Sequence, residues 1–167
     1  MKLLGAGLLW TSLICVGAVY SIKLKKRVDI LEKTLLMLEE MKMLLKYLNV
    51  PVNEMLKKLC EKDYLSELSF LYECSFELQQ NRDFPVAWRD SLENSSHLYK
   101  SAEIDRLLQL GQNLGASDAE NQIKLLDLQT VYFEEYLDIA KNKYKKQGNT
   151  ALTLSALAGC MIFIVII

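Results

Sequence analysis

Two stretches without any charged residue lie at opposite ends of the chain. Residues 3–22 are twenty consecutive residues that lack Asp, Glu, Lys and Arg, and residues 151–167 are seventeen more. Neither stretch has the polar stripe that a helix at the surface of a soluble core carries. As helices they are about 30 Å and about 25 Å long, and a bilayer core is about 30 Å thick. We therefore predict one transmembrane helix in residues 1–22 and another in residues 151–167.

A cleaved signal peptide is the alternative interpretation of the first stretch. Lys2 precedes it, as in a signal peptide. However, no small-x-small cleavage site closes it, because Tyr20 is too large for the last position of Ala18-Val19-Tyr20. A dense basic cluster follows at once, which is typical of a stop-transfer flank. These signals favour an uncleaved membrane helix.

The basic residues near the two stretches predict the orientation of the chain. Eight of them lie at the two ends of the central segment, whereas Lys2 alone lies on the other side of a predicted span. The eight are Lys23, Lys25, Lys26, Arg27, Lys141, Lys143, Lys145 and Lys146. Because Lys and Arg are enriched in cytoplasmic loops, we expect the central segment in the cytoplasm and both termini across the membrane.

The central segment, residues 23–150, shows helical periodicity and no strand-like alternation. Its apolar residues predict six helices. The first covers about residues 25–48 and ends before Pro51. The others carry, in order, Val52, Leu56 and Leu59; Leu65, Leu68, Leu71, Phe76 and Leu78; Val86, Trp88 and Leu92; Ile104, Leu107, Leu108 and Leu114; and Ile123, Leu126, Phe133, Leu137, Ala140 and Tyr144.

Turn and cap residues support these boundaries. Pro85 suits the first turn of the fourth helix, and Ser101 is expected to cap the fifth. Gly115 stands where a helix end favours a left-handed residue, and we expect Gly111 to permit a close helix approach. Ser117 has the spacing of a capping box with Glu120, in which each side chain bonds the other residue's backbone N–H.

The composition gives little support for catalysis. The chain has 20 Lys+Arg, 21 Asp+Glu and a net charge of −1, which argues against a nucleic-acid binder. His97, the single histidine, lies in a polar gap and is expected at the surface. Cys60 and Cys74 lack a C-x-x-C spacing and are expected as buried small side chains. We expect no catalytic residue, no cofactor and no metal site, and predict that the protein is not an enzyme.

A set of motifs between the two predicted spans resembles the stage III sporulation protein AB family. The motifs are Pro85-Val86-Ala87-Trp88; Leu107-x-x-Leu110-Gly111-x-x-Leu114-Gly115-x-Ser117-Asp118-x-x-x-Gln122; Lys143-Tyr144 with Gly148; and an apolar tail with Gly159. The likeness covers nearly the whole chain, and the Leu-Gly-x-Ser-Asp-x-x-x-Gln segment is its most specific part. The tail departs from the family, because Cys160-Met161 replaces a more aliphatic sequence.

The resemblance implies a fold and a function. Family members belong to endospore-forming bacteria and join a secretion-like channel in the mother-cell membrane around the forespore, where they support forespore development. The implied fold is all-α: a six-helix cytoplasmic bundle similar to the type II secretion F domain, flanked by one transmembrane helix at each end. The implied partners are a sporulation secretion-type ATPase and other channel proteins, and a homo-oligomer stays open.

We expect the partner interface or motif positions of such a platform at Trp88, Gly111, Gly115, Ser117, Asp118 and Gln122. Asp118 and Gln122 lie one helical turn apart and are hypothesised to face a partner. The alternative is structural: Trp88 fills the core, the glycines turn the chain and Ser117 caps a helix.

Two other classes of protein stay open at this point. A membrane hydrolase needs a nucleophile and a base, and neither is evident in the sequence. A general two-span adaptor of another secretion or cell-division complex fits the same spans and the same helices.

Overall fold

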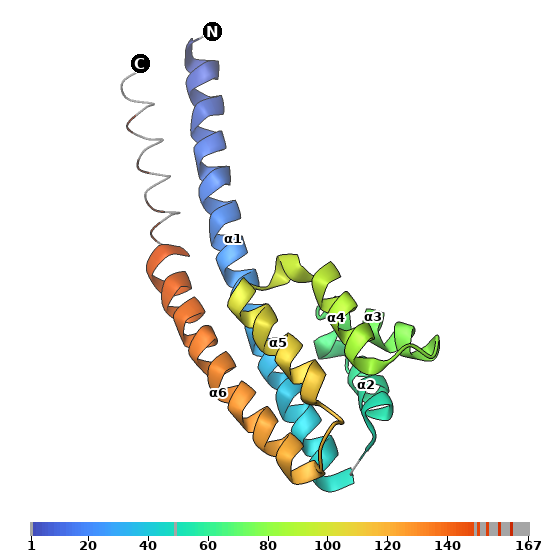
Figure 1. Cartoon of the computed structure of the whole chain (residues 1–167). Helices are drawn as coiled ribbons and strands as arrows, with labels where there is room; N and C mark the ends of the chain where they lie inside the picture. The colour runs from blue at the N-terminus through green and yellow to red at the C-terminus, as the bar shows by residue number, and fades with distance from the viewer. Residues whose placement is uncertain are drawn as a thin grey trace. The chain divides into compact units, whose positions relative to one another are not determined.

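The structure is a computed structural model that describes residues 2–48, 50–148 and 150, together with Thr153, Leu157 and Met161 (Figure 1). Of residues 2–11, 13 and 14 it describes the backbone alone. The six α-helices of this part of the chain are α1 (Lys2–Met43), α2 (Val52–Cys60), α3 (Ser69–Gln79), α4 (Phe84–Asn94), α5 (Ser101–Asn113) and α6 (Ala119–Lys143). Shorter helical turns are η1 (Leu44–Leu48), η2 (Asp63–Leu65), η3 (Ser96–Leu98) and η4 (Tyr144–Gly148). The predicted all-α fold with six helices is confirmed.

The two predicted membrane helices are not confirmed. Among the residues that the structure describes, no helix combines the length and the apolar character needed to cross a membrane. The second predicted span, residues 151–167, lies outside the described residues except for Thr153, Leu157 and Met161. Both spans therefore stay predictions from the sequence.

The chain forms two compact units. Unit 1 consists of residues 1–29 and 137–167, and unit 2 consists of residues 30–136. The unit boundaries fall inside α1 and α6, whereas the sequence placed domain boundaries after residues 22 and 150.

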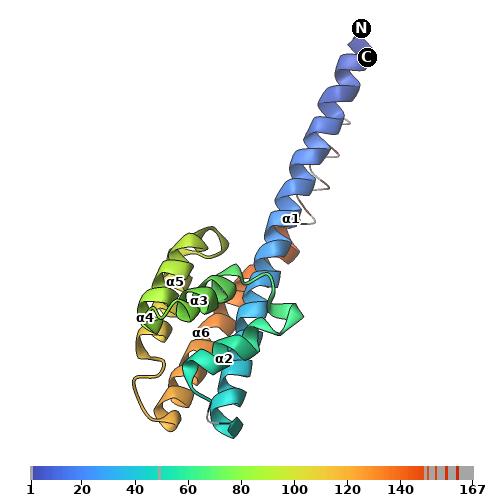
Figure 2. The same cartoon turned by 90° about the vertical axis from the view of Figure 1, so that its right-hand side faces the viewer.

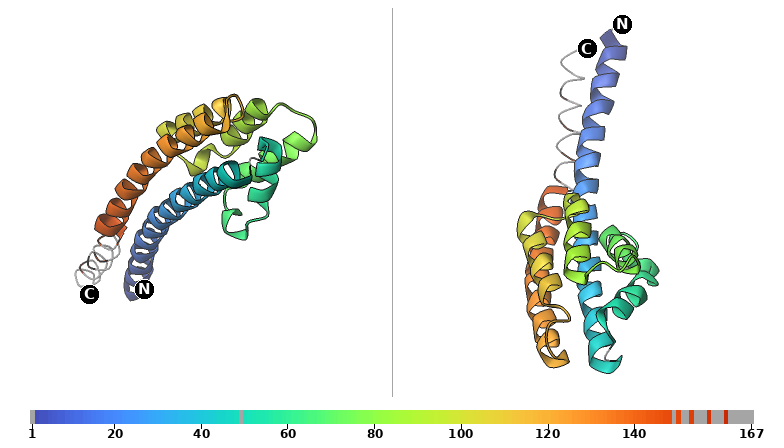
Figure 3. Two further views of the ribbon diagram at one scale, coloured as in Figure 1. Left: turned by 90° about the horizontal axis from the view of Figure 1, so that it is seen from below. Right: turned by 45° about the vertical axis from the view of Figure 1, so that its right-hand side comes forward.

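Unit 2 contains the shorter helices and the second half of α1. Within it, α5 runs alongside α6 and the C-terminal half of α1 (Figures 1 and 3). Figure 2 shows α3 between α2 and α4, and the chain packs these three helices in that order. Three contacts between distant residues tie the helices together: Lys42 forms an ion pair with Asp127, Lys33 forms one with Glu67 at 2.5 Å, and the Arg106 guanidinium lies 3.6 Å from the ring centre of Tyr132.

Local backbone chemistry explains most of the helix boundaries. The carbonyl of Pro51 accepts the N–H groups of Glu54 and Met55 and so begins α2. Asn81 adopts φ 61°, and the N–H of Arg82 returns to the carbonyl of Glu77 at 3.3 Å, which closes α3. Asparagine tolerates this left-handed conformation better than most residues. Pro85 lies in the first turn of α4, as predicted.

Two boundary predictions were wrong. Leu65 and Leu68 precede α3 instead of belonging to it, because the chain makes a 3₁₀ turn at Asp63–Leu65 and Leu68 has a non-helical ψ of 71°. Ser101 does not cap α5 from outside but is its first residue. The Glu103 carboxylate instead accepts the N–H of Lys100 at 2.8 Å, from inside the first turn.

The core of unit 2 is drawn from every helix. The side chains with no exposed area include Met37, Leu38, Met41, Met55, Leu56, Leu59, Leu65, Leu68, Phe70, Leu71, Cys74, Ala87, Trp88, Leu92, Leu107, Leu110, Leu126 and Phe133. Phe76 does not belong to this set although the periodicity grouped it with the apolar residues of its helix. It is 60% exposed.

A buried hydrogen-bond chain joins the loop before α5 to α1. The Thr34 hydroxyl donates to the carbonyl of Ile30 at 2.8 Å, so the Tyr99 hydroxyl donates to Thr34 at 2.9 Å. Tyr99 also packs edge-on against Phe70, with ring centres 6.2 Å apart. Burial raises the pKa of Tyr99 well above its ordinary value, so the phenol stays protonated.

In unit 1, the part of α1 that follows Tyr20 runs beside η4 and the end of α6, in the opposite direction (Figures 1 and 3). The hydroxyl of Tyr20 donates to the side-chain oxygen of Gln147 at 2.8 Å. Gly148 is buried, and a Cβ atom at this position would lie 3.4 Å from the Ser21 hydroxyl. The ring of Tyr144, one turn earlier in the same segment, would lie closer still, at 2.9 Å from that Cβ atom. The absence of a side chain at Gly148 therefore chiefly leaves room for the Tyr144 ring.

Candidate functional site

Trp88 on α4 and Gly111 on α5 form one closely fitted contact. The indole of Trp88 has no exposed area, and its Nε1 donates to the carbonyl of Leu107 at 2.7 Å. A Cβ atom on Gly111 would lie 2.1 Å from Cδ1 of Trp88. The indole therefore lies directly on the backbone of α5, one turn after the carbonyl that it bonds. The predicted close approach at Gly111 is confirmed.

Two further aromatic rings hold Trp88 in place. Phe70 on α3 packs edge-on against it at 5.2 Å between ring centres, and Phe84 at the start of α4 lies 5.5 Å away. Edge-on aromatic pairs are stabilising beyond their burial. Trp88 thus joins α3, α4 and α5. It fills the core, which was the structural alternative given for this residue from the sequence.

The loop between α5 and α6 is organised by one buried amide. Gln122 is 8% exposed, and its Oε1 accepts the N–H of Gly115 at 3.1 Å while its Nε2 donates to the carbonyl of Ser117 at 2.6 Å. Gly115 has φ +82°, which confirms the predicted left-handed residue. A Cβ atom there would also lie 3.0 Å from Val52 of α2. Only glycine can adopt this positive φ and leave the space beside Val52 empty without strain.

The cap of α6 differs from the prediction. α6 begins at Ala119, and the carboxylate of Asp118 accepts the N–H of Asn121 at 3.3 Å. Asp118 is therefore the capping residue, and the capping box from Ser117 to Glu120 was wrong. Glu120 instead forms an ion pair with Lys124 at 2.7 Å. The sequence pattern was shifted by one residue, because Asp caps a helix as well as Ser does.

The six motif residues thus separate into two structural groups. Trp88 and Gly111 form the contact between α4 and α5, and Gly115, Ser117, Asp118 and Gln122 organise the turn into α6. The side chain of Gln122 is not presented at the surface, because it is buried and both ends of its amide bond the loop. Asp118 and Ser117 are exposed.

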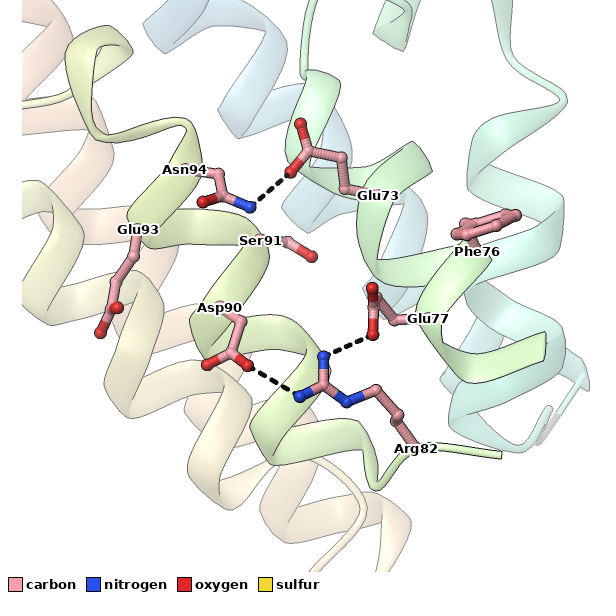
Figure 4. Close-up of a pocket in the computed structure, with 8 residues that line it drawn as sticks. All are labelled: Glu73, Phe76, Glu77, Arg82, Asp90, Ser91, Glu93 and Asn94. Carbon is pink, nitrogen blue, oxygen red and sulfur yellow. Dashed lines mark hydrogen bonds and ion pairs between the residues drawn. The ribbon is translucent and has the colours of Figure 1, made fainter. Parts of the chain in front are cut away.

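A polar groove between α3 and α4 is a feature that the sequence did not indicate (Figure 4). It has a volume of about 550 Å³. Its lining consists of Glu73, Phe76, Glu77, Arg82, Asp90, Ser91, Glu93 and Asn94. Contact between two helices that meet only in the fold creates it, so neither helix alone carries the pattern.

One guanidinium bridges the groove. Arg82 bonds Glu77 of α3 at 2.5 Å and Asp90 of α4 at 3.3 Å, as the dashed lines in Figure 4 show. The hydrogen bond to Glu77 raises the pKa of Arg82, so it stays charged. The Asn94 amide donates to Glu73 at 3.3 Å. The lining holds four carboxylates and one guanidinium, and Arg89 next to the lining also pairs with Asp90 at 3.1 Å. The groove therefore keeps a negative charge, which suits a cationic partner.

The remaining chemical candidates behave as ordinary side chains. His97 is exposed in η3, as predicted. Cys74 is buried as predicted, Cys60 is half-buried, and both are free thiols. Burial is the main cause that raises the pKa of Cys74 to about 12. Within the described ranges, no three His, Cys, Asp or Glu side chains lie close enough together to hold a metal ion.

Comparison with known proteins identifies the family. The model of the family described as stage III sporulation protein AB matches residues 2–167. Neither the search of curated proteins nor the search of solved structures found a match. The match spans both units and all six motif residues, and it agrees with the resemblance seen in the sequence. The chain belongs to the stage III sporulation protein AB family.

Proposed function

We propose that this protein is a non-enzymatic membrane platform in a sporulation-specific, secretion-like channel between mother cell and forespore. The observation that carries the proposal is the family match over residues 2–167. Membership of this family is consistent with a role in sporulation. In the proposal, the protein couples a cytoplasmic ATPase to the membrane complex, and forespore development needs it.

The membrane part of the proposal rests on the sequence. Residues 3–22 and 151–167 lack charged residues, and basic residues follow the first stretch and precede the second. We place both termini outside, residues 23–150 in the cytoplasm, and the protein in the mother-cell membrane around the forespore. The helical central part is then the counterpart of the type II secretion F domain.

The interior of unit 2 suits a scaffold that transmits force. Trp88 joins three helices, and the Tyr99–Thr34 hydrogen bond anchors the loop before α5 to α1. A close-packed interior of this kind has low compressibility and transmits strain between its helices. Differential binding of partners, and no bond chemistry, is then the work of the protein.

We propose the groove between α3 and α4 as the main ATPase contact. Its carboxylates are complementary to a basic surface, and exposed Phe76 adds apolar area at its wall. Asp118 at the start of α6 is the second proposed contact. Its side chain is exposed, and only one of its two carboxylate oxygens is used to cap the helix.

The test is a titration of the full chain, in detergent micelles, into the sporulation secretion-type ATPase of the same organism. We expect saturable binding with a Kd in roughly the micromolar range. The double variant Glu73→Lys, Glu93→Lys is expected to weaken binding by about tenfold or more. Asp118→Lys tests the second contact.

Asp105→Lys is the matched control for the single charge reversal Asp118→Lys. Asp105 is exposed on α5 outside the groove lining, so the same charge reversal there is expected to leave binding unchanged. A folded, helical full chain that does not bind the ATPase would refute the coupling role and favour a scaffold whose contacts are made through its membrane segments. Expression independent of sporulation would favour a general two-span adaptor.

A further inference from the structure

Two lysine clusters of unit 1 lie at the same level although they are more than a hundred positions apart in the sequence. Lys23, Lys25 and Lys26 follow Tyr20 on α1, and Lys143, Lys145 and Lys146 precede Gln147 on α6 and η4. The Tyr20–Gln147 hydrogen bond joins the two segments at 2.8 Å. Because the segments run in opposite directions, both clusters lie on the same side of this bond.

The clusters also lie close to that bond along each helix. Lys26 is six residues from Tyr20, and Lys143 is four residues from Gln147. At a rise of about 1.5 Å per residue, all six lysines start within about 9 Å of the level of the bond. We call these six residues the lysine collar: Lys23, Lys25, Lys26, Lys143, Lys145 and Lys146.

The lysine collar carries charge that its surroundings do not neutralise. All six side chains are exposed, and in the part of the chain that the structure describes none of them forms an ion pair. Unit 1 contains only two carboxylates, Asp29 and Asp138, and Asp138 accepts a hydrogen bond from Asn142. The site therefore has a strong positive potential in a chain whose net charge is only −1.

The charge changes abruptly at the Tyr20–Gln147 level. The twenty residues of the chain that end at Ile22 carry no charge, and none follows Gln147. Tyr20 is 41% exposed at this level, and tyrosine is enriched where membrane meets water. Lysines placed just beyond such a boundary reach the phosphates of lipid headgroups with their flexible stems.

We propose that the lysine collar binds the headgroups of anionic phospholipids, so that the protein gathers acidic lipid around its membrane entry point. This inference rests on the proposed membrane insertion and names the lipid class that the inserted protein selects. Acidic lipids attract juxtamembrane lysines electrostatically, and salt weakens that attraction.

The experiment uses the full chain in nanodiscs of phosphatidylcholine and phosphatidylglycerol, with a trace of spin-labelled lipid of either kind. The measured quantity is the association of each labelled lipid with the protein relative to bulk lipid. We expect phosphatidylglycerol to associate at least about fivefold more strongly than phosphatidylcholine, and added sodium chloride to reduce the difference. Inorganic phosphate at equal ionic strength is expected to have no larger effect than sodium chloride.

Three variants locate the effect. The triple variants Lys23→Gln, Lys25→Gln, Lys26→Gln and Lys143→Gln, Lys145→Gln, Lys146→Gln are each expected to reduce the preference by about half or more. The matched control, Lys46→Gln, Lys57→Gln, Lys100→Gln, removes the same charge from exposed lysines of unit 2 and is expected to keep it.

The outcomes separate this inference from the proposed function. Equal association of both lipids with an inserted protein, or unchanged preference in both triple variants, overturns the lipid assignment and leaves the platform role intact. Specific competition by inorganic phosphate makes the lysine collar a site for free phosphate and overturns it too. A folded protein that does not enter nanodiscs refutes the proposed membrane insertion, and the lipid assignment with it.

Discussion

The Cβ atom that Gly111 lacks would lie 2.1 Å from Cδ1 of Trp88. This contact places the largest side chain of the core directly on the backbone of a neighbouring helix. It also explains two motif positions together, because the indole needs the space at Gly111 and its buried N–H finds an acceptor in the carbonyl of Leu107 at 2.7 Å. A single methyl group at Gly111 therefore tests the fit.

Gly111→Ala is expected to destabilise the protein by about 3 kcal/mol, because the indole is fully buried and cannot withdraw without disturbing Phe70. The measurement is urea unfolding of the full chain in detergent micelles, followed by circular dichroism. Gln112→Ala, at the exposed neighbouring position, is the control and is expected to change the free energy of unfolding by less than about 0.5 kcal/mol.

A double-mutant cycle makes the cause specific. In a Trp88→Phe background the ring is smaller, so Gly111→Ala is expected to cost at least about 1 kcal/mol less than in the natural chain. Equal costs in both backgrounds would show that the indole is not what excludes the methyl group.

Gln122→Leu is expected to destabilise the protein by about 2 kcal/mol. Leucine has a similar size but leaves the N–H of Gly115 and the carbonyl of Ser117 without their partner. The matched control is Gln112→Leu, the same chemical change at an exposed position. If the two variants unfold at the same urea concentration, the amide does not hold the loop.

The cap of α6 distinguishes two neighbouring residues. Asp118→Ala is expected to cost about 1 kcal/mol, because the N–H of Asn121 loses its acceptor, and Asp118→Asn is expected to cost much less. Ser117→Ala is expected to have almost no effect on the free energy of unfolding. The opposite order for the two alanine variants would restore the capping box that the sequence pattern suggested.

Cys74 is expected to make stability depend on pH above neutrality. Burial raises the pKa of its thiol from 9.0 to about 12, so the folded protein keeps it neutral while the unfolded chain ionises it. The stabilising contribution is therefore complete below pH about 9 and is lost as pH rises from there towards about 12. The loss reaches at most about 1.4 kcal/mol per pH unit.

Other groups titrate in the same range, so the measurement is the difference between the natural chain and Cys74→Ala at several pH values. The difference in unfolding free energy is expected to shrink as pH rises, and a constant difference would contradict the raised pKa. Cys74 is also expected to resist alkylation at neutral pH until the chain unfolds, because the thiol is buried and protonated.

Local sequence patterns were sufficient to predict the helices and the residues near which they begin and end. Spacing of apolar residues predicted six helices, and Pro51, Pro85 and Gly115 marked their ends, because a backbone hydrogen bond or a left-handed φ depends on residues within about four positions. The motif order also pointed to the family that the comparison shows.

The contacts of these residues depend on how the helices pack against one another. Asp118 caps α6, whereas the capping-box spacing had favoured Ser117. Gln122 is buried, whereas a partner contact was hypothesised for it, and Phe76 is exposed although periodicity grouped it with the apolar residues. The groove between α3 and α4 and the lysine collar combine residues from separate helices, so no local spacing records them. Which residues of separate helices come together depends on how the helix surfaces fit against one another. That fit is a property of the packed chain and not of any stretch within it.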